Sequence, residues 1–207
     1  MITWEITRAS AFVAFGCYTL VVAWGVLLSS RFWRPVAPQL GFHRFLGSLG
    51  LVAVGTHITT LMLDHYAHVY LSSLAGLDPR PGVVVGAVAL WLALALPLSF
   101  RLKRAGLMTQ RAWRGLHYAG YLMWAAALVH GIMSGTDTRS PWALAFYGSA
   151  AAVVGAAAWW RWSELPAAAP AARPRRAPER EAPERRPRPA TRETAQRRPR
   201  PAMQEAD

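Results

Sequence analysis

The sequence predicts an all-α membrane protein, a bundle of five transmembrane helices followed by a disordered C-terminal tail. Three features of its 207 residues support this fold: five long stretches without charge, a hydrophobic content of 53% against 16% charged residues, and an abrupt change of composition near position 166. We therefore expect a helical membrane domain over residues 1–165 and a separate tail over residues 166–207.

The five predicted spans are the stretches of the first 165 residues that contain no Asp, Glu, Lys or Arg. A helix rises about 1.5 Å per residue and the hydrocarbon core of a bilayer is about 30 Å thick, so roughly 20 apolar residues cross it. The stretches are 19 to 22 residues long: 9–30, 45–63, 81–100, 115–136 and 140–160. Buried helices of a soluble domain would need polar faces, which these stretches lack.

The charges that flank the spans predict the orientation of the chain. The connections after the first and third spans carry eight basic residues: Arg31, Arg34, Arg44, Arg101, Lys103, Arg104, Arg111 and Arg114. The opposite connections carry three arginines against four acidic residues. Because Lys and Arg are retained in the cytoplasm, we expect the N-terminus outside and the tail in the cytoplasm, with membrane lipid around the spans.

The predicted tail has a composition of its own. It holds 11 of the 23 basic residues, six of the 11 acidic residues, nine of the 15 prolines and no aromatic residue. Such a segment cannot bury enough apolar surface to offset its chain entropy, so we expect disorder. A basic tail beside a membrane suits anionic lipid or an acidic partner, and a solvated appendage is the equal alternative. Nucleic-acid binding is not expected without aromatic or structured context.

A single cysteine, Cys17, excludes several kinds of site. The chain cannot build a disulfide scaffold, a Cys-rich zinc site or an iron–sulfur cluster from its own ligands. It also lacks the Cys-x-x-Cys-His sequence for covalent haem attachment.

Four of the six histidines lie in or at the ends of two predicted spans. His43 and His57 belong to the second span, and His117 and His130 belong to the fourth. Both spans run outward from the cytoplasm, so His43 and His117 lie near the inner interface and the other two lie toward the outer half. Two imidazoles at one depth on two helices are what a haem with two axial histidines requires, because both nitrogens must face one iron.

The histidine spacings fit one span better than the other. Fourteen residues correspond to about 21 Å of rise and return within about 40° of the same helix face, whereas 13 residues turn the second ligand about 140° away. We therefore expect local unwinding near Gly115 or Gly120, or a π-bulge, in the fourth span. Single histidines in membranes also form helix–helix hydrogen bonds. Four at matched depths favour haem over such bonds, over a proton relay and over other metal ions, which need further Cys or carboxylate ligands.

Several motifs accompany these histidines. They are Trp-Glu-Ile-Thr-Arg-Ala-Ser at 4–10, His43-Arg44-Phe45-Leu46-Gly47 with His57, Trp113-Arg114-Gly115-Leu116-His117-Tyr118, His130-Gly131, and Gly135-Thr136-Asp137-Thr138. Over residues 3–162 the chain resembles the bacterial ferric reductase-like transmembrane domain family, and the spacings of 14 and 13 are those of the wider superfamily of ferric reductases and NADPH oxidases. The resemblance implies two stacked b-type haems in a bacterial cytoplasmic (inner) membrane, an inner one on His43 and His117 and an outer one on His57 and His130.

The resemblance also implies electron passage from the cytosol to the exterior. Eukaryotic relatives carry a flavin- and nicotinamide-binding domain after the last helix, but here the tail follows without a Gly-x-Gly-x-x-Gly motif, so we expect no FAD or NAD(P)H site on this chain. The donor is then a separate flavoprotein, a quinol or a partner subunit, and the acceptor or partner protein is extracytoplasmic. The chain would be the membrane electron-transfer subunit of an oxidoreductase. The alternative is a non-redox membrane scaffold or assembly subunit of a larger complex.

Charged and loop residues give further candidates with plainer alternatives. Arg8 and Arg44 suit haem propionates, because a guanidinium matches a carboxylate bidentately, and they also suit interfacial anchoring. His65 and His68, beside Asp64, form a candidate loop metal site, with solvated loop histidines as the alternative.

Two further groups of residues suit either the cofactor or ordinary packing. Trp124 and Phe45 are candidates for contact with the haems or with neighbouring helices. Gly47, Gly50 and Gly55 give the second span a face of small residues, which admits either a macrocycle or another helix.

Overall fold

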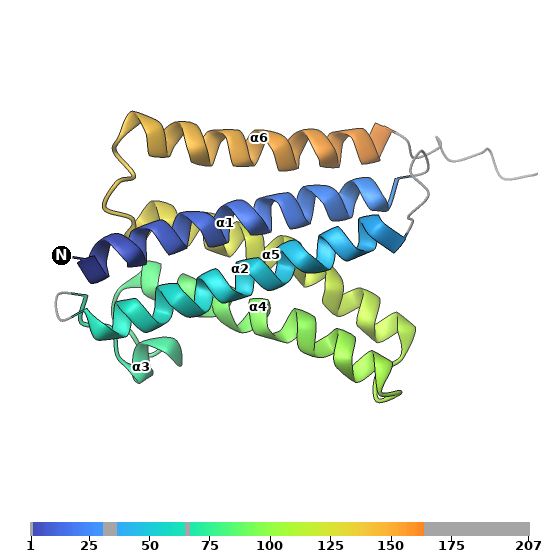
Figure 1. Cartoon of the computed structure of the whole chain (residues 1–207), viewed down its shortest axis with the longest axis horizontal. Coiled ribbons are helices and arrows are strands. Elements are labelled where there is room, and N and C mark those ends of the chain that lie inside the picture. Colours follow the sequence, from blue (N-terminus) through green and yellow to red (C-terminus); the bar gives the residue numbers. More distant parts are fainter. Residues whose placement is uncertain (1, 31–36, 65–66, 164–207) are drawn as a thin grey trace, which may run out of the picture. The chain divides into compact units, whose positions relative to one another are not determined.

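The computed structural model describes residues 2–30, 37–64 and 67–163. These residues form six helices: α1 (Ile2–Leu28), α2 (Ala37–Leu63), α3 (Leu71–Leu74), α4 (Pro81–Arg104), α5 (Gln110–Ser134) and α6 (Pro141–Ser163) (Figure 1). The predicted all-α class is confirmed, and each predicted span falls on one of the five long helices. The predicted tail, together with Arg31, Arg34 and His65, lies outside the described residues.

Four of the helices, α1, α2, α4 and α6, are long and apolar enough to cross a membrane. The chain is therefore a multi-pass membrane protein whose apolar helix surfaces contact lipid. The helix α5 has 25 residues but is not among these four, because even its uncharged part contains His117 and His130 together with tyrosines and glycines, which lower its hydropathy. The prediction of five spans is thus confirmed for four helices.

The helices pack in two close pairs. The most extensive packing is that of α1 with α2 and of α4 with α5, and α6 lies against α1. In the middle of the bundle, Tyr18 of α1 meets Ala93 of α4 and Met123 of α5 in a buried cluster. The ring of Tyr18 also lies over Gly50 of α2, where an added Cβ would stand 3.1 Å from the ring. This glycine therefore serves the approach of a neighbouring helix.

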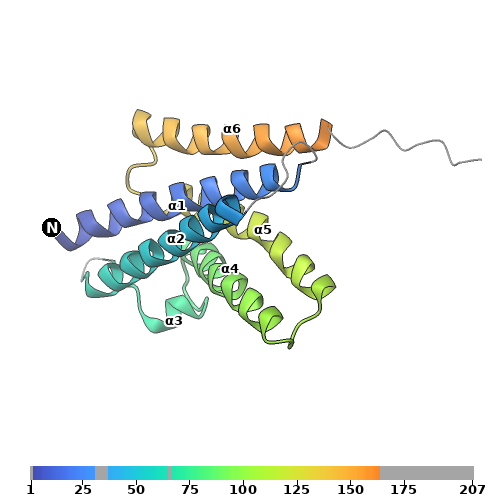
Figure 2. The ribbon, with the colours of Figure 1, turned by 45° about the vertical axis from the view of Figure 1, so that its right-hand side comes forward.

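The helix α5 is uninterrupted from Gln110 to Ser134. The unwinding or π-bulge predicted from the 13-residue spacing is therefore wrong. In both views of the ribbon, α5 crosses α2 at an angle (Figures 1 and 2). Where two helices cross, the direction from one axis to the other rotates along the helix, so side chains on different faces of α5 can meet the same neighbour. The crossing takes the place of a local distortion.

The connection between α2 and α4 is fastened by Arg80. Its guanidinium donates to the carbonyls of Ala67 and His68, at 3.0 and 3.1 Å, and to the carboxylate of Asp78 at 2.9 Å. The Ser73 hydroxyl donates to the same carboxylate at 2.6 Å. Hydrogen bonds from Arg80 and Ser73 hold the pKa of Asp78 well below its usual range. The short helix α3 is thereby fixed beside the end of the bundle where α1 begins.

Candidate functional site

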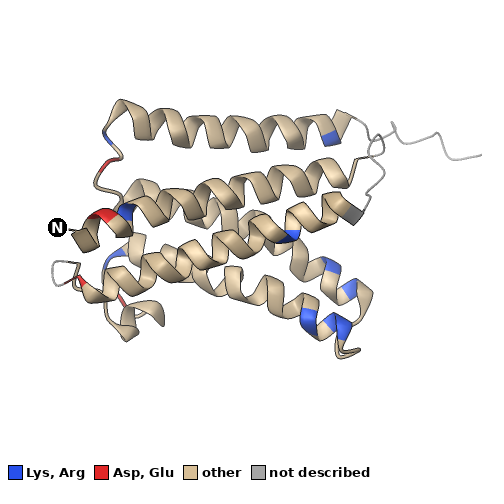
Figure 3. Cartoon of the chain, in the orientation of Figure 1, with Lys and Arg blue, Asp and Glu red and all other residues tan. Residues whose placement is uncertain are grey.

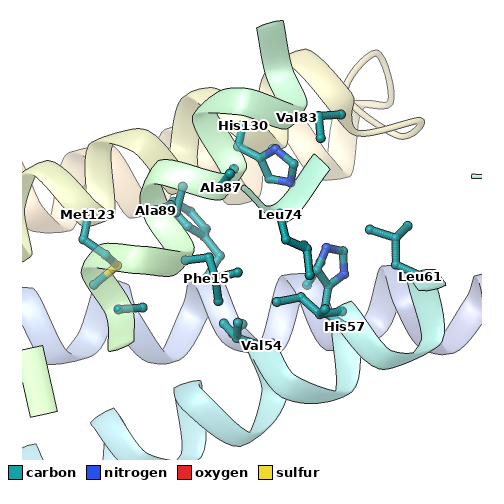
Figure 4. Close-up of a pocket in the computed structure, with 18 of the residues that line it drawn as sticks. Phe15, Val54, His57, Leu61, Leu74, Val83, Ala87, Ala89, Met123 and His130 are labelled. Atoms are coloured by element: carbon teal, nitrogen blue, oxygen red, sulfur yellow. The ribbon is translucent and has the colours of Figure 1, made fainter. Parts of the chain in front are cut away.

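His57 of α2 and His130 of α5 face one another across the space between their helices. Their ring centroids lie 6.4 Å apart, with the ring planes at 76°. Figure 4 shows both rings pointing into one cavity, which is walled mainly by apolar side chains such as Val54, Leu74 and Met123. An apolar cavity with two convergent imidazoles is typical of a cofactor site.

Hydrogen bonds to backbone carbonyls select one tautomer of the rings of His57 and His130. The Nδ1 of His57 lies 2.9 Å from the carbonyl oxygen of Thr7 in α1, and the Nδ1 of His130 lies 2.7 Å from that of Gly82 in α4. A carbonyl only accepts hydrogen bonds, so Nδ1 must carry the proton in both rings. Each Nε2 then keeps a lone pair, which is the arrangement that metal-ligating histidines adopt.

His43 of α2 and His117 of α5 form a second facing pair, nearer the other end of the bundle. Their ring centroids lie 6.2 Å apart, with the planes at 59°. The indole of Trp113 stacks on His117 with the centroids 5.1 Å apart, and the Lys103 ammonium lies 4.0 Å from the centre of that indole. The ring of His117 is therefore oriented by stacking.

The ring of His43 lies against α1 at a glycine. A Cβ added to Gly25 would stand 3.3 Å from its Cε1. Its Nδ1 is buried with the Val21 carbonyl nearby, but it forms no hydrogen bond within the described chain. The two histidine pairs thus have similar ring separations but differ in how their rings are held.

The spacing of both pairs fits two imidazoles on one metal ion. An imidazole nitrogen binds a metal at about 2 Å, and the ring centre lies about 1 Å further away, so two opposed rings have centroids about 6 Å apart. The observed centroid distances are 6.2 and 6.4 Å. No group of three or more His, Cys, Asp or Glu gathers in the described residues. Two protein ligands therefore suit a metal that arrives with its own ligand ring, as in haem.

At His57 and His130 a cavity lies between α2 and α5. These two helices pack on α1 and α4 respectively, rather than closely on each other. Added Cβ atoms at Gly47 and Gly55 of α2 would meet nothing within 4 Å. Of the three glycines predicted as a small-residue face, Gly50 therefore serves helix packing, whereas the other two border open space.

The two arginines predicted as propionate partners have different surroundings in the structure. Arg8 donates to both carboxylate oxygens of Asp137, at 2.6 and 2.7 Å, and to Glu5 at 3.1 Å. Arg44 is exposed, with its guanidinium 5.0 Å from the ring centre of Phe100. The structure thus places Arg8 in an ion-pair network at the end of the bundle where α1 begins.

The predicted loop metal site is only partly within the described residues. Asp64 is buried and accepts a hydrogen bond from the Thr3 hydroxyl at 3.1 Å, while the backbone of His68 turns with a φ of 47°. These contacts tie the loop to α1 and to Arg80. His65 lies outside the described residues.

The two aromatic candidates have different surroundings. Trp124 donates from its indole nitrogen to the Thr19 hydroxyl at 2.9 Å and stacks on Phe15 at 6.0 Å, so it packs α5 against α1. Phe45 is 61% exposed and faces away from the core.

The sequence analysis did not assign roles at the site to five residues: Thr7, Gly82, Gly86, Lys103 and Trp113. The contact of Trp113 with His117 could have been predicted, since positions four apart on a helix meet on one face. Thr7 and Gly82 contribute backbone carbonyls, and these leave no mark in a sequence.

No family model, curated protein or solved structure matches the chain. The fold and the site together define a multi-pass helical membrane protein with two facing histidine pairs at different depths.

Proposed function

We propose that the chain is a dihaem b-type transmembrane electron-transfer protein. It passes electrons from a cytosolic or quinol donor to an extracytoplasmic acceptor. The observation that carries this proposal is the pair of ring separations, 6.2 Å for His43 with His117 and 6.4 Å for His57 with His130. Both are close to the separation of about 6 Å expected for two imidazoles on one iron, and a helix-packing role for the histidines would not require this separation.

The residues of the chain hold and shield the two haems. His43 and His117 would hold the inner haem, and His57 and His130 would hold the outer haem. Each histidine would bind through its unprotonated ring nitrogen. Each haem supplies an iron that accepts and releases one electron. The carbonyls of Thr7 and Gly82 keep the proton on Nδ1 of the outer rings, and the apolar walls exclude water.

The proposal includes α5 as a fifth membrane span, because its histidines must reach the same depths as those of α2. The N-terminus lies outside and the tail lies in the cytoplasm of a bacterial cell. Figure 3 supports this orientation, since the described acidic residues lie at the end where α1 begins and most Lys and Arg lie at the opposite end. The membrane is the cytoplasmic (inner) membrane, as the resemblance to bacterial ferric reductase-like domains implies.

The donor and acceptor are separate molecules in this proposal. A flavoprotein, a quinol or a partner subunit supplies electrons at the cytoplasmic end, and an acceptor or partner protein takes them at the other end. The chain then acts as the membrane subunit of an oxidoreductase. A non-redox scaffold is the alternative outcome of the test.

Histidine substitution tests the proposal in the purified full-length chain. His57→Ala and His130→Ala should each remove about one of two b-type haems per chain, and His43→Ala and His117→Ala should remove the other, since each level depends on both of its ligands. His68→Asn is the matched control, because this loop histidine turns with a positive φ that Asn tolerates. Four variants with the haem content of the control would reject the haem sites and favour the scaffold.

A further inference from the structure

We propose that the inner histidine pair holds its haem at a higher midpoint potential than the outer pair, and that Lys103 and Trp113 set the difference. This inference depends on the proposed electron-transfer function. It follows from how the two pairs of rings are held and from the charges around them. It determines where the first electron that enters the protein resides.

The outer ligands are strengthened as electron donors. His57 and His130 each donate a hydrogen bond from Nδ1 to a backbone carbonyl, at 2.9 and 2.7 Å. Such a bond shifts electron density toward Nε2 and makes the imidazole a more basic ligand. A more basic ligand stabilises the oxidised iron more than the reduced iron, so the outer haem has the lower midpoint potential.

The inner ligands lack this support. Within the described residues the ring of His117 forms no hydrogen bond, and the buried Nδ1 of His43 lies near the Val21 carbonyl without the close hydrogen bond that the outer rings form. The ring of His117 is instead stacked on Trp113. Stacking fixes the plane of the ring but provides no hydrogen-bond acceptor for its nitrogens. The inner imidazoles are therefore weaker donors than the outer ones, which raises the potential of the inner level.

Charge acts in the same direction. The Lys103 ammonium lies 4.0 Å from the centre of the Trp113 indole, and this indole stacks on the ring of His117. A cation is therefore held close to the inner site. A nearby cation favours the reduced iron, which carries one positive charge fewer. At the outer end, the cation of Arg8 is balanced by Asp137 and Glu5. That network gives the outer level no comparable positive charge.

A higher midpoint potential at the inner haem determines where an electron prefers to reside. In the isolated chain, the first electron resides on the inner haem. Its onward step to the outer level runs against the difference in midpoint potential. A membrane potential that is negative inside favours the outward movement of an electron, so it promotes this step in an energised membrane.

The test is a potentiometric titration of the purified full-length chain, followed by its visible spectrum. We expect two one-electron waves, with the higher wave absent from His43→Ala and the lower wave absent from His57→Ala. Lys103→Gln should move only the higher wave, toward more negative potential, and Trp113→Leu should move it too. Arg111→Gln is the matched control, because this exposed cation lies at the start of α5, close in sequence to Trp113, and has no cation–π contact with its indole.

Three results would overturn the inference: a lower wave that disappears with His43→Ala, a Lys103→Gln shift in the lower wave, or a Lys103→Gln effect no larger than that of Arg111→Gln. If a single histidine variant loses both haems, the Lys103→Gln shift alone assigns the inner wave. Absence of any haem wave in the unmodified chain would instead reject the proposed function itself.

Discussion

Gly86 of α4 lies directly against the ring of His130 of α5. A Cβ added at Gly86 would stand 2.5 Å from the Nδ1 of His130 and 2.7 Å from its Cε1. Real Cβ atoms do not approach other atoms so closely, so one of the two must move. The ring moves more easily than the helices, because it is the free end of a side chain. Glycine at this position thus allows His130 to lie beside α4 and reach the Gly82 carbonyl.

Gly86→Ala should therefore displace the outer ligand while the fold persists. We expect haem content to fall to about one per chain, with the outer component lost, because an iron that needs two axial histidines loses one. Haem quantification with circular dichroism checks both parts. The control is Gly148→Ala in α6, where an added Cβ meets nothing within 4 Å. Unchanged haem content in Gly86→Ala would contradict the packing described for His130.

The ion pair of Arg8 with Asp137 joins α1 to the connection that precedes α6. Both side chains are partly buried, with 30% and 20% of their areas exposed, and the contact is bidentate. Asp137→Asn should lower the free energy of unfolding by about 1 kcal/mol, since exposed pairs contribute less and fully buried pairs more. Thermal unfolding in detergent, followed by circular dichroism, measures the change.

A charge-reversed double variant distinguishes two roles of Arg8, the ion pair with Asp137 and a contact with a haem propionate. Arg8→Asp combined with Asp137→Arg should recover part of the stability that either single reversal loses, because an ion pair can form again. It should leave the outer haem in place. Loss of the outer haem in the double variant, with stability recovered, would show that the guanidinium at position 8 is needed by the haem.

The packing of Tyr18 over Gly50 makes a second glycine sensitive to substitution. An added Cβ at Gly50 would stand 3.1 to 3.3 Å from three ring atoms of Tyr18, which is 6% exposed and packed against Ala93 and Met123. We expect Gly50→Ala to destabilise the protein by about 1–3 kcal/mol through overpacking. Gly155→Ala, where the added Cβ meets nothing within 4 Å, should be neutral or slightly stabilising in the same unfolding measurement.

Much of the fold could be predicted because charge is so costly in a bilayer. The charged residues that bound the spans also lie near the ends of the long helices, for example Arg80 before α4 and Arg104 at its end. The histidine pairing could be predicted from depth alone. Uniform helix geometry could not predict that α5 crosses α2, because crossing angles depend on the packing of all the helices. The partners of His57 and His130 were equally inaccessible, since they are carbonyls that any residue provides.

The hydrogen bonds of Arg80 and Ser73 to Asp78 should persist in moderately acidic solution. Hydrogen bonds from Arg80 and Ser73 lower the pKa of this carboxyl in the folded protein. A depressed pKa contributes stability that is complete above the unfolded pKa of about 4 and is lost only as the pH falls through the folded value. Hydrogen exchange of residues 67–80 should therefore remain protected from pH 7 down to about pH 4, after correction for the intrinsic rate.

Asp78→Asn tests how much the negative charge at position 78 contributes to holding residues 67–80. The amide cannot accept the paired hydrogen bonds of the guanidinium as a carboxylate does, so protection over residues 67–80 should fall at pH 7. Protection in α1 and α2 should stay unchanged, which distinguishes loosening of the loop from unfolding. Equal protection in the variant and the unmodified chain would show that the loop is held by other contacts.

The most direct measurement of the central claim is the haem stoichiometry of the unmodified chain, expressed with haem supplied and purified intact. It combines haem quantification with a dithionite-reduced minus oxidised absorption spectrum. The two facing histidine pairs predict about two b-type haems per chain, each with the spectrum of a six-coordinate iron bound by two imidazoles. A chain that folds and binds no haem would contradict the account, and the histidine pairs would then be contacts of a membrane scaffold.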